Sequence, residues 1–267
     1  MSDYTAYNTC SYPNREAPDV VLLRRHRPAT TTRPERRNTL PENALFDEWP
    51  ERYDRWFTTP IGRLVRQTEG ELISELLAPK AGESVLDAGC GTAVFTLDIL
   101  GTGAEVVGLD ISGRMLEVAG KKAAGCAFFP VQADMQFLPF RDSSFDKTIS
   151  VTALEFVADA RAAADELFRV TRPGGTVVVA TLNSLSPWAT RRQAKAQSGQ
   201  RHILEDAHYR SPSDLLALSP FPGVTKTAVH FQNDDDPDKA MDIERTGRLR
   251  GLDTGAFVAV RWQMPPG

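Results

Sequence analysis

The glycine-rich segment 85–93 has the residue types and spacing that most clearly indicate chemistry. It reads Val-Leu-Asp-Ala-Gly-Cys-Gly-Thr-Ala, at the end of an apolar stretch and the start of a helical pattern. Glycines at such a junction let a ligand approach the backbone closely, and the first N–H groups of a helix have no partner within it. An anionic group is favoured there. The segment therefore predicts a binding site for a nucleotide-like ligand.

Asp87 distinguishes between the two cofactor classes that use this geometry. A dinucleotide site prefers Gly-x-Gly-x-x-Gly/Ala, with its pyrophosphate on the helix N-terminus, whereas the last of these positions is Val94 here. A carboxylate two residues before Gly89 would repel a pyrophosphate, but it suits a ligand that carries an ammonium and a sulfonium. The residues therefore favour S-adenosylmethionine over NAD.

Two further aspartates follow the next two apolar stretches. Asp110 ends the second stretch, where an acid accepts both hydroxyls of a ribose in nucleotide-binding βαβ units. Asp134 follows the third, where it can accept from an adenine amino group while Met135 packs on the ring. Each aspartate alone is equally well explained as a solvated loop residue. Three of them at successive strand ends, beside a glycine loop, favour a ligand site.

An alternation of short apolar strands and amphipathic helices must position these residues. The predicted strands are 84–88, 105–110, 127–132, 147–152 and 176–182, and the predicted helices are 93–100, 113–123 and 160–170. Such alternation implies a parallel sheet with helices on both faces. Beyond it, the sequence predicts a short helix at 212–218, with Ser211 as its N-cap, and two final strands at 224–231 and 256–262.

The flanking segments complete the predicted organisation. Residues 1–43 are rich in proline and arginine and poor in apolar periodicity, so we expect a disordered arm. Residues 44–80 predict two capping helices broken at Pro60. In the main domain, residues 81–267, segments 183–211 and 233–253 are candidate substrate lids. The second is polar and acid-rich, and a solvated loop is the simpler interpretation of it.

Composition excludes several classes of protein. The formal net charge of −4 is inconsistent with a basic field over the whole protein, so nucleic acid is an improbable partner. The apolar runs fall short of the ~20 residues of a membrane helix, and no secretion signal opens the chain. Cys10, Cys90 and Cys126 are far apart, which argues against a zinc site. We expect three unpaired thiols in a cytoplasmic protein.

Taken together, the motifs resemble the class I S-adenosylmethionine-dependent methyltransferases. The similarity is greatest to the type 11 group, which includes quinone-biosynthesis methyltransferases. The segments that carry it are 85–93, the strand end at Asp110, 132–134 with 138–140, 144–146, and 169–175. This resemblance implies a Rossmann-like, seven-stranded, mostly parallel sheet. Its strand order would be 3-2-1-4-5-7-6, with the last strand antiparallel and helices on both faces.

The resemblance also assigns cofactor roles to individual residues. Those expected around the methionine moiety are Asp87, Gly89, Cys90 and Gly91. Asp110 would bind the ribose, and those expected to frame the adenine are Ile111, Asp134 and Met135. Thr152 would lie near the methyl group. Tyr53 would belong to a helix that caps the cofactor, although its pattern fits a core position equally well.

The chain departs from the family pattern at Ala93, where a third glycine is usual. If this residue needs a positive φ, alanine would cost about 1 kcal/mol. Because we expect residues 92 and 93 to lie within the helix, we predict that the position needs only a small side chain.

The reaction implied is an in-line displacement on the sulfonium methyl by an O, N, S or C nucleophile of the acceptor. Proximity and orientation supply much of the acceleration, and a general base is needed only where the nucleophile must lose a proton. The segment 152–156 lacks the Asn/Asp-Pro-Pro-aromatic motif of amino-methylating enzymes, which favours a small-molecule acceptor. Alternatives are an RNA or protein methyltransferase that uses the basic arm, and a non-catalytic S-adenosylmethionine-binding protein.

The acceptor side offers weaker candidates. Glu155 is the nearest carboxylate and a candidate base, although local pairing is the simpler interpretation. The candidates for contacts with the acceptor are Trp188, His202, His208 and Tyr209. No spacing among the histidines is typical of a metal site, so we expect no metal.

Overall fold

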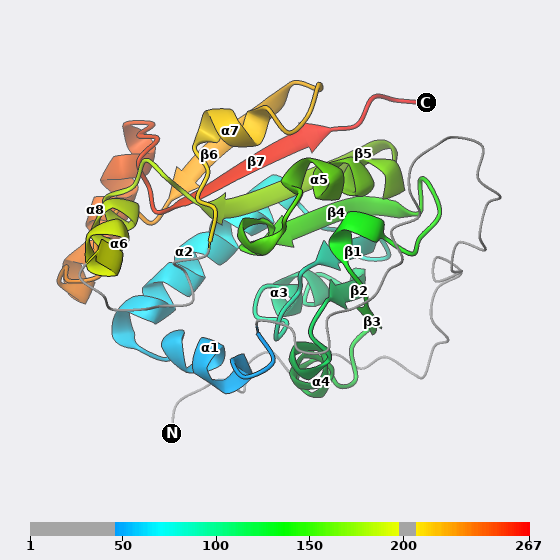
Figure 1. Ribbon diagram of the computed structural model, residues 1–267, viewed down its shortest axis with the longest axis horizontal. Helices are drawn as coiled ribbons and strands as arrows, with labels where there is room; N and C mark the ends of the chain where they lie inside the picture. Colours follow the sequence, from blue (N-terminus) through cyan, green and yellow to red (C-terminus); the bar gives the residue numbers. More distant parts are fainter. Residues whose placement is uncertain (1–45, 198–206) are drawn as a thin grey trace.

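The computed structural model of the chain describes residues 46–197 and 207–267, which form a layered α/β arrangement (Figure 1). The expected arm, residues 1–43, and the candidate His202 lie outside the described residues. At the centre is one seven-stranded sheet with the order β3-β2-β1-β4-β5-β7-β6. Its strands are β1 Ser84–Ala88, β2 Glu105–Asp110, β3 Phe128–Gln132, β4 Phe145–Val151, β5 Thr171–Leu182, β6 Gly223–Ala228 and β7 Phe257–Gln263.

Strand directions agree with the expected topology. The pairs from β3 to β5 are all parallel, and β7 is antiparallel to both β5 and β6. The inner strands β1, β2 and β4 and the second half of β5 are almost wholly buried, which explains why they read as continuous apolar runs rather than alternating patterns. The carboxyl ends of the parallel strands therefore lie at one edge, where ligands bind in open α/β sheets.

The helices begin where the sequence provides caps. They are α1 Pro50–Trp56, α2 Pro60–Leu77, α3 Thr96–Leu100, α4 Gly113–Lys122, α5 Ala160–Val170, α6 Pro187–Gln197, α7 Pro212–Leu216 and α8 Pro237–Leu249, with two short 3-10 turns, η3 Met135–Phe137 and η4 Leu154–Phe156. The Thr59 side chain caps α2, and Ser112 caps α4 by accepting from the Met115 amide. Ser211 and Asp214 form a capping box at α7.

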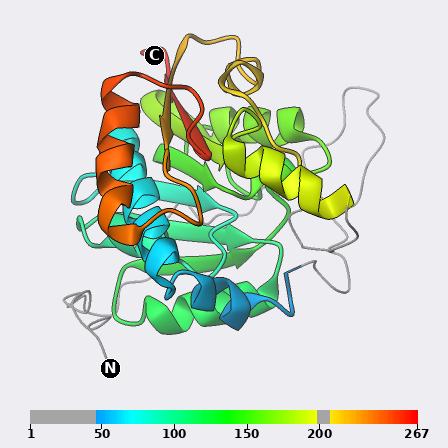
Figure 2. The ribbon, with the colours of Figure 1, turned by 90° about the vertical axis from the view of Figure 1, so that its left-hand side faces the viewer.

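Two apolar layers cover the sheet. One contains residues of α2 and α3 together with Ala240 of α8, and the other contains residues of α5 and α7. Around the carboxyl edge of the sheet, α1, α2 and α6 surround the strand ends (Figure 2). This ring of helices bounds the place where a ligand would lie.

The expectation of a solvated loop at 233–253 is wrong, because the segment contains helix α8. Ala240, Glu244 and Gly247 are buried against the rest of the protein. The Arg248 guanidinium bonds Glu244 at 2.6 Å and the Thr68 carbonyl of α2 at 3.1 Å. The buried face thus consists of small residues and an ion pair rather than an apolar stripe, which is why the hydrophobic pattern did not indicate a helix.

The cysteines also differ from the expectation of three unpaired thiols. Cys90 is a free, buried thiol, whereas Cys126 takes part in a disulfide bond. Spacing along the sequence excluded a close pair, but it carries no information about which distant cysteines meet in the fold.

Candidate functional site

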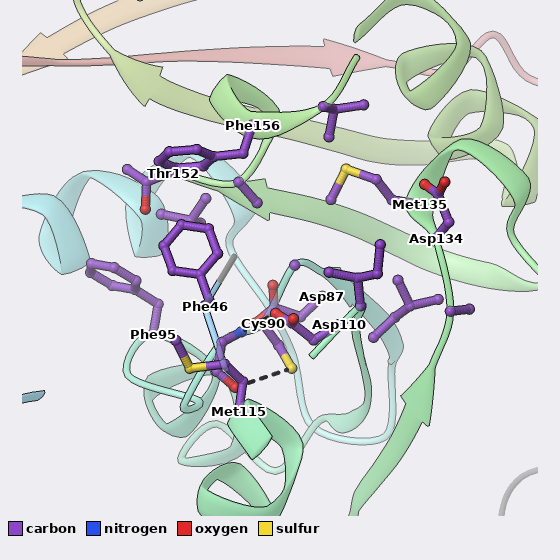
Figure 3. Close-up of a pocket in the computed structure, with 18 of the residues that line it drawn as sticks. Phe46, Asp87, Cys90, Phe95, Asp110, Met115, Asp134, Met135, Thr152 and Phe156 are labelled. Carbon is purple, nitrogen blue, oxygen red and sulfur yellow. Dashed lines mark hydrogen bonds between the residues drawn. The ribbon is translucent and has the colours of Figure 1, made fainter. Parts of the chain in front are cut away.

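A cavity of about 320 Å³ opens at the carboxyl ends of the first, second and fourth strands (Figure 3). It is lined by all ten residues that the sequence proposed for the cofactor: Tyr53, Asp87, Gly89, Cys90, Gly91, Asp110, Ile111, Asp134, Met135 and Thr152. The structure therefore brings these residues together, although they come from five separate stretches of the chain.

The glycine loop after β1 forms the floor of the cavity. The amides of Gly89 and Cys90 both donate to the Leu109 carbonyl, at 2.6 and 3.0 Å, which holds the loop against β2. Gly89 has a φ of 81°, and a Cβ there would lie 2.3 Å from the Ala153 Cβ. Gly91 has a φ of 52°, and a Cβ there would meet nothing within 4 Å. The first glycine permits close packing, and the second leaves the backbone open to the cavity.

The loop continues through Ala93, and the expectation that residues 92 and 93 belong to the helix is wrong. Ala93 has a φ of 63°, and α3 begins only at Thr96. The Thr96 hydroxyl donates to Asp87 at 2.6 Å, so the first residue of the helix is fixed to the end of β1. Alanine therefore occupies a left-handed position, at a cost of about 1 kcal/mol relative to glycine.

Asp110 connects the two loops that meet below the cavity. One carboxylate oxygen accepts from the Gly91 amide and the other from the Ser112 amide, both at 2.9 Å. Burial raises the pKa of the Asp110 carboxyl, and the amides act in the opposite direction. A carboxylate has about four acceptor sites, so acceptor capacity remains for donors from a ligand.

Asp87 lies beside Asp110 in Figure 3 and is also buried. Burial raises its pKa to about 7, the hydrogen bond from Thr96 lowers it, and the nearby Asp110 raises it. Within the described part of the chain, neither aspartate forms an ion pair. Two buried carboxyls without a counter-charge create a negative field, which suits a cationic ligand.

Helix α1 is tied to the glycine loop by Asp54. One carboxylate oxygen accepts from the Thr92 hydroxyl at 2.6 Å, and the other pairs with the Lys122 ammonium of α4 at 2.6 Å. Tyr53, the preceding residue, lines the cavity, where burial raises the pKa of its phenol and the neighbouring Thr152 side chain lowers it. Thr152 follows β4 with a φ of 46°. The two residues thus meet above the end of the fourth strand.

Most of the remaining lining is apolar and was not predicted from the sequence. Phe46 packs edge-on against Phe156 with ring centroids 4.8 Å apart, and Phe95 and Met115 lie below them (Figure 3). Asp134 accepts from the Gln136 amide at 2.9 Å and caps η3, which carries Met135. The aromatic content of residues 46–57 was the available signal, but it fits a core helix equally well.

The acceptor candidates do not line this cavity. Glu155 is fully buried, accepts from the Leu182 amide at 2.7 Å and has a pKa raised by burial to about 7. Trp188 is buried and donates to the Phe231 carbonyl at 2.7 Å. His208 is exposed, and its amide donates to the Glu155 carbonyl. Tyr209 is half-buried beside it. Contacts of this kind hold neighbouring loops in place.

Among residues 46–197 and 207–267 there is neither a metal-binding cluster nor a membrane-spanning helix. No group of three His, Cys, Asp or Glu side chains is placed to hold a metal ion. Of the helices in these ranges, none is both long and apolar enough to cross a membrane.

Comparisons with known proteins agree with this geometry. Residues 86–179 match the family model of a type 11 methyltransferase domain. The chain is 32% identical over 187 residues to a malonyl-[acyl-carrier protein] O-methyltransferase of Pectobacterium atrosepticum, covering 62% of this chain and 73% of that one. It is 36% identical over 148 residues to a demethylmenaquinone methyltransferase of Beutenbergia cavernae, covering 54% and 59%. The chain spans about half the length of several such relatives.

The fold also has solved counterparts. A crystal structure of an S-adenosylmethionine-dependent methyltransferase from Thermotoga maritima superposes with a TM-score of 0.62 at 22% identity, covering 82% of this chain and 97% of that one. The chain therefore belongs to the S-adenosylmethionine-dependent methyltransferase family, in the type 11 group.

Proposed function

We propose that this protein transfers a methyl group from S-adenosylmethionine to a small-molecule acceptor. The observation that carries the proposal is the cavity itself. In it, two buried carboxyls that form no ion pair with another described residue lie beside an open glycine loop. When bound, S-adenosylmethionine supplies an electrophilic methyl group on a sulfonium sulfur. A negative, largely enclosed cavity favours such a cation over a pyrophosphate.

Each lining residue has a role that its contacts support. Asp87 and the Gly91 backbone hold the methionine end, the first by charge and the second by close approach. Asp110 keeps acceptor capacity for the ribose hydroxyls. Asp134 and Met135 frame the adenine, and Tyr53 covers the cofactor from α1. Thr152 marks the end of the cavity at which the methyl group is presented.

A small or carrier-bound acceptor is supported by three observations. The relatives named above act, by their names, on demethylmenaquinone and on a malonyl group carried by a protein. The segment after β4 reads Thr-Ala-Leu-Glu-Phe rather than the motif of amino-methylating enzymes. The acidic net charge also disfavours a nucleic-acid substrate.

The first experiment is calorimetry of the full chain with S-adenosylmethionine, S-adenosylhomocysteine and, as a control, NAD. We expect binding of the first two and none of the third. Binding of NAD alone would overturn the interpretation of Asp87. Absence of all binding would show that the cavity is not a cofactor site in the free protein.

A further inference from the structure

A second cavity lies outside the cofactor site. Its volume is about 680 Å³, and none of the described residues that line it also lines the cofactor cavity. Its walls come from the first residue of α6, from α8, and from the segments that precede and follow α8. Both helices lie at the end of the molecule that faces the viewer in Figure 2. This cavity has no role in the function proposed above.

The backbone beside this cavity is held in a strained conformation. Val229 is a buried, β-branched residue with a φ of 64°, a left-handed conformation that is unfavourable for such a side chain. The Val229 carbonyl accepts from the Ala256 amide at 2.9 Å. One residue further on, the His230 amide donates to the Glu244 carboxylate of α8 at 2.7 Å. Strain that the surrounding structure maintains in this way is typical of ligand-binding sites.

His230 lines the cavity, and its imidazole lacks hydrogen-bond partners. Both ring nitrogens are buried, and neither completes a hydrogen bond within residues 46–197 and 207–267, although the Thr227 backbone lies near the ring. The ring packs against α8, where a Cβ on Gly247 would lie 2.2 Å from the His230 Cγ. The helix therefore carries a glycine in its interior, which is unfavourable. Buried polar groups without a partner are rare, so this imidazole calls for one outside the fold.

The charged side chains of the lining favour an anion. The Arg250 guanidinium forms neither an ion pair nor a hydrogen bond with another described residue. The Lys239 ammonium pairs loosely with Asp236, at 4.0 Å. Asp242, the acidic residue of the described lining, is balanced by Arg245 at 3.0 Å. The cavity thus has two cations that no carboxylate neutralises closely, and an anion would be attracted to them.

We propose that this cavity binds a small phosphate monoester. Near neutral pH such a phosphate carries close to two negative charges, which match Lys239 and Arg250, whereas a carboxylate carries one. Ile243 and Leu252 line the same cavity and are partly exposed, so they offer contacts to an apolar group on the ester. Because the ring nitrogens of His230 are buried, the imidazole turns toward the cavity to donate to the phosphate. The inference does not depend on methyl transfer.

Calorimetry of the full chain at about pH 7.5 tests the class of ligand. The probes are phenyl phosphate, inorganic phosphate, benzoate and benzyl alcohol. We expect phenyl phosphate to bind most tightly, inorganic phosphate more weakly because it lacks the ring, and benzoate more weakly because it carries a single charge. Benzyl alcohol has no charge and should not bind measurably. The proposal is overturned if phenyl phosphate does not bind, or if benzoate or benzyl alcohol binds as tightly.

Two matched variants assign the binding to this cavity. Arg250→Gln removes a charge-assisted hydrogen-bond donor, so we expect the affinity for phenyl phosphate to fall by about tenfold or more. Arg261→Gln removes the same charge from an exposed position on β7 that lines neither cavity, so the affinity should stay within about twofold. Equal losses in the two variants would mean attraction to surface cations in general, which contradicts the proposal.

The imidazole signals in NMR spectra test the part assigned to His230. Burial lowers the pKa of this imidazole, so at about pH 7.5 it is neutral and has one N–H to donate. The chain has four histidines, and His230→Gln identifies the signals of this one. We expect saturating phenyl phosphate to shift the His230 signals and to leave those of the exposed His208 unchanged. Unshifted His230 signals in the bound protein would remove this residue from the site.

S-adenosylhomocysteine separates the two cavities. We expect its presence to leave the affinity for phenyl phosphate unchanged, because the two cavities have no described lining residue in common. Competition between the two ligands would place the phosphate probe in the cofactor cavity and would rule out the second site. If S-adenosylhomocysteine itself does not bind, the proposed function fails, and the comparison of Arg250→Gln with Arg261→Gln still decides whether the phosphate site exists.

Discussion

The cavity has two sides that are built in different ways. The glycine-loop side, with Asp87, Gly91 and Asp110, comes from turns that directly follow adjacent parallel strands. The helical side, with Tyr53, comes from helix α1, which precedes the sheet in the chain. The first side is held by hydrogen bonds between neighbouring strand ends, through the backbone of the glycine loop and the Asp110 carboxylate. The Asp54 carboxylate ties the second side to the glycine loop. The shape of the glycine loop therefore depends on adjacent strands, whereas the cover of the cavity depends on a distant segment.

The largest expected effect tests the charge on the glycine-loop side. Because the folded-state pKa of Asp87 is raised to about 7, its stabilising contribution is complete below its unfolded pKa and is lost as the pH rises through about 7. We expect Asp87→Asn to flatten the pH dependence of the free energy of unfolding, by of the order of 3 kcal/mol between acid and alkaline conditions. Denaturant titrations of the ligand-free protein across this range measure it.

A control for this prediction comes from the cofactor. Saturating S-adenosylmethionine supplies a positive partner for Asp87, so the wild-type dependence on pH should weaken when it is bound. A wild-type protein whose stability has the same pH dependence as that of Asp87→Asn would contradict the buried-carboxyl account.

The next effect compares two glycines of the same loop. Gly89→Ala should lower the free energy of unfolding by about 3 kcal/mol. The cost of a positive φ in alanine adds to the cost of placing its Cβ 2.3 Å from the Ala153 side chain. Gly91→Ala meets open space, so only the backbone term of about 1 kcal/mol remains. Thermal or denaturant unfolding measures both losses. If the two variants lose the same free energy of unfolding, the approach to Ala153 does not require glycine at position 89.

Asp110 tests the assignment of the ribose. Asp110→Ala removes charge-assisted hydrogen bonds worth ~1.5–3 kcal/mol, which corresponds to roughly 10–150-fold in cofactor affinity. Calorimetry with S-adenosylhomocysteine measures the change, and Glu117→Ala, an exposed change on α4, is the matched control. Unchanged affinity in Asp110→Ala would end the ribose assignment.

Much of the fold was predictable because its signals are short-range. The strand ends at Asp87, Asp110 and Asp134 follow apolar runs, and parallel strands bring such ends to one edge. Helix α8 was missed because its buried face uses Gly247 and the Glu244–Arg248 pair, whose partner Thr68 lies far away in the chain. The place of Tyr53 over the cavity depends on which helices meet, and periodicity does not encode this.

Glu155 provides a smaller effect on the helical side. Glu155→Gln keeps an oxygen for the Leu182 amide, so we expect cofactor affinity and turnover to change by less than about threefold. A collapse of turnover with normal cofactor binding would instead identify Glu155 as a catalytic base. Initial rates with an acceptor that the wild-type protein methylates, together with calorimetry, distinguish the two results.

The smallest effect returns to the glycine loop, at Ala93. Ala93 has a φ of 63° and a fully buried methyl group. Ala93→Gly relieves about 1 kcal/mol of backbone strain, but glycine also gains freedom in the unfolded chain and the buried methyl contact is lost. We expect a net gain of no more than about 1 kcal/mol in denaturant unfolding. A clear loss of free energy of unfolding would mean that packing of the Ala93 methyl group outweighs its backbone strain. The conformation of the glycine loop would then also depend on the neighbours of this methyl group.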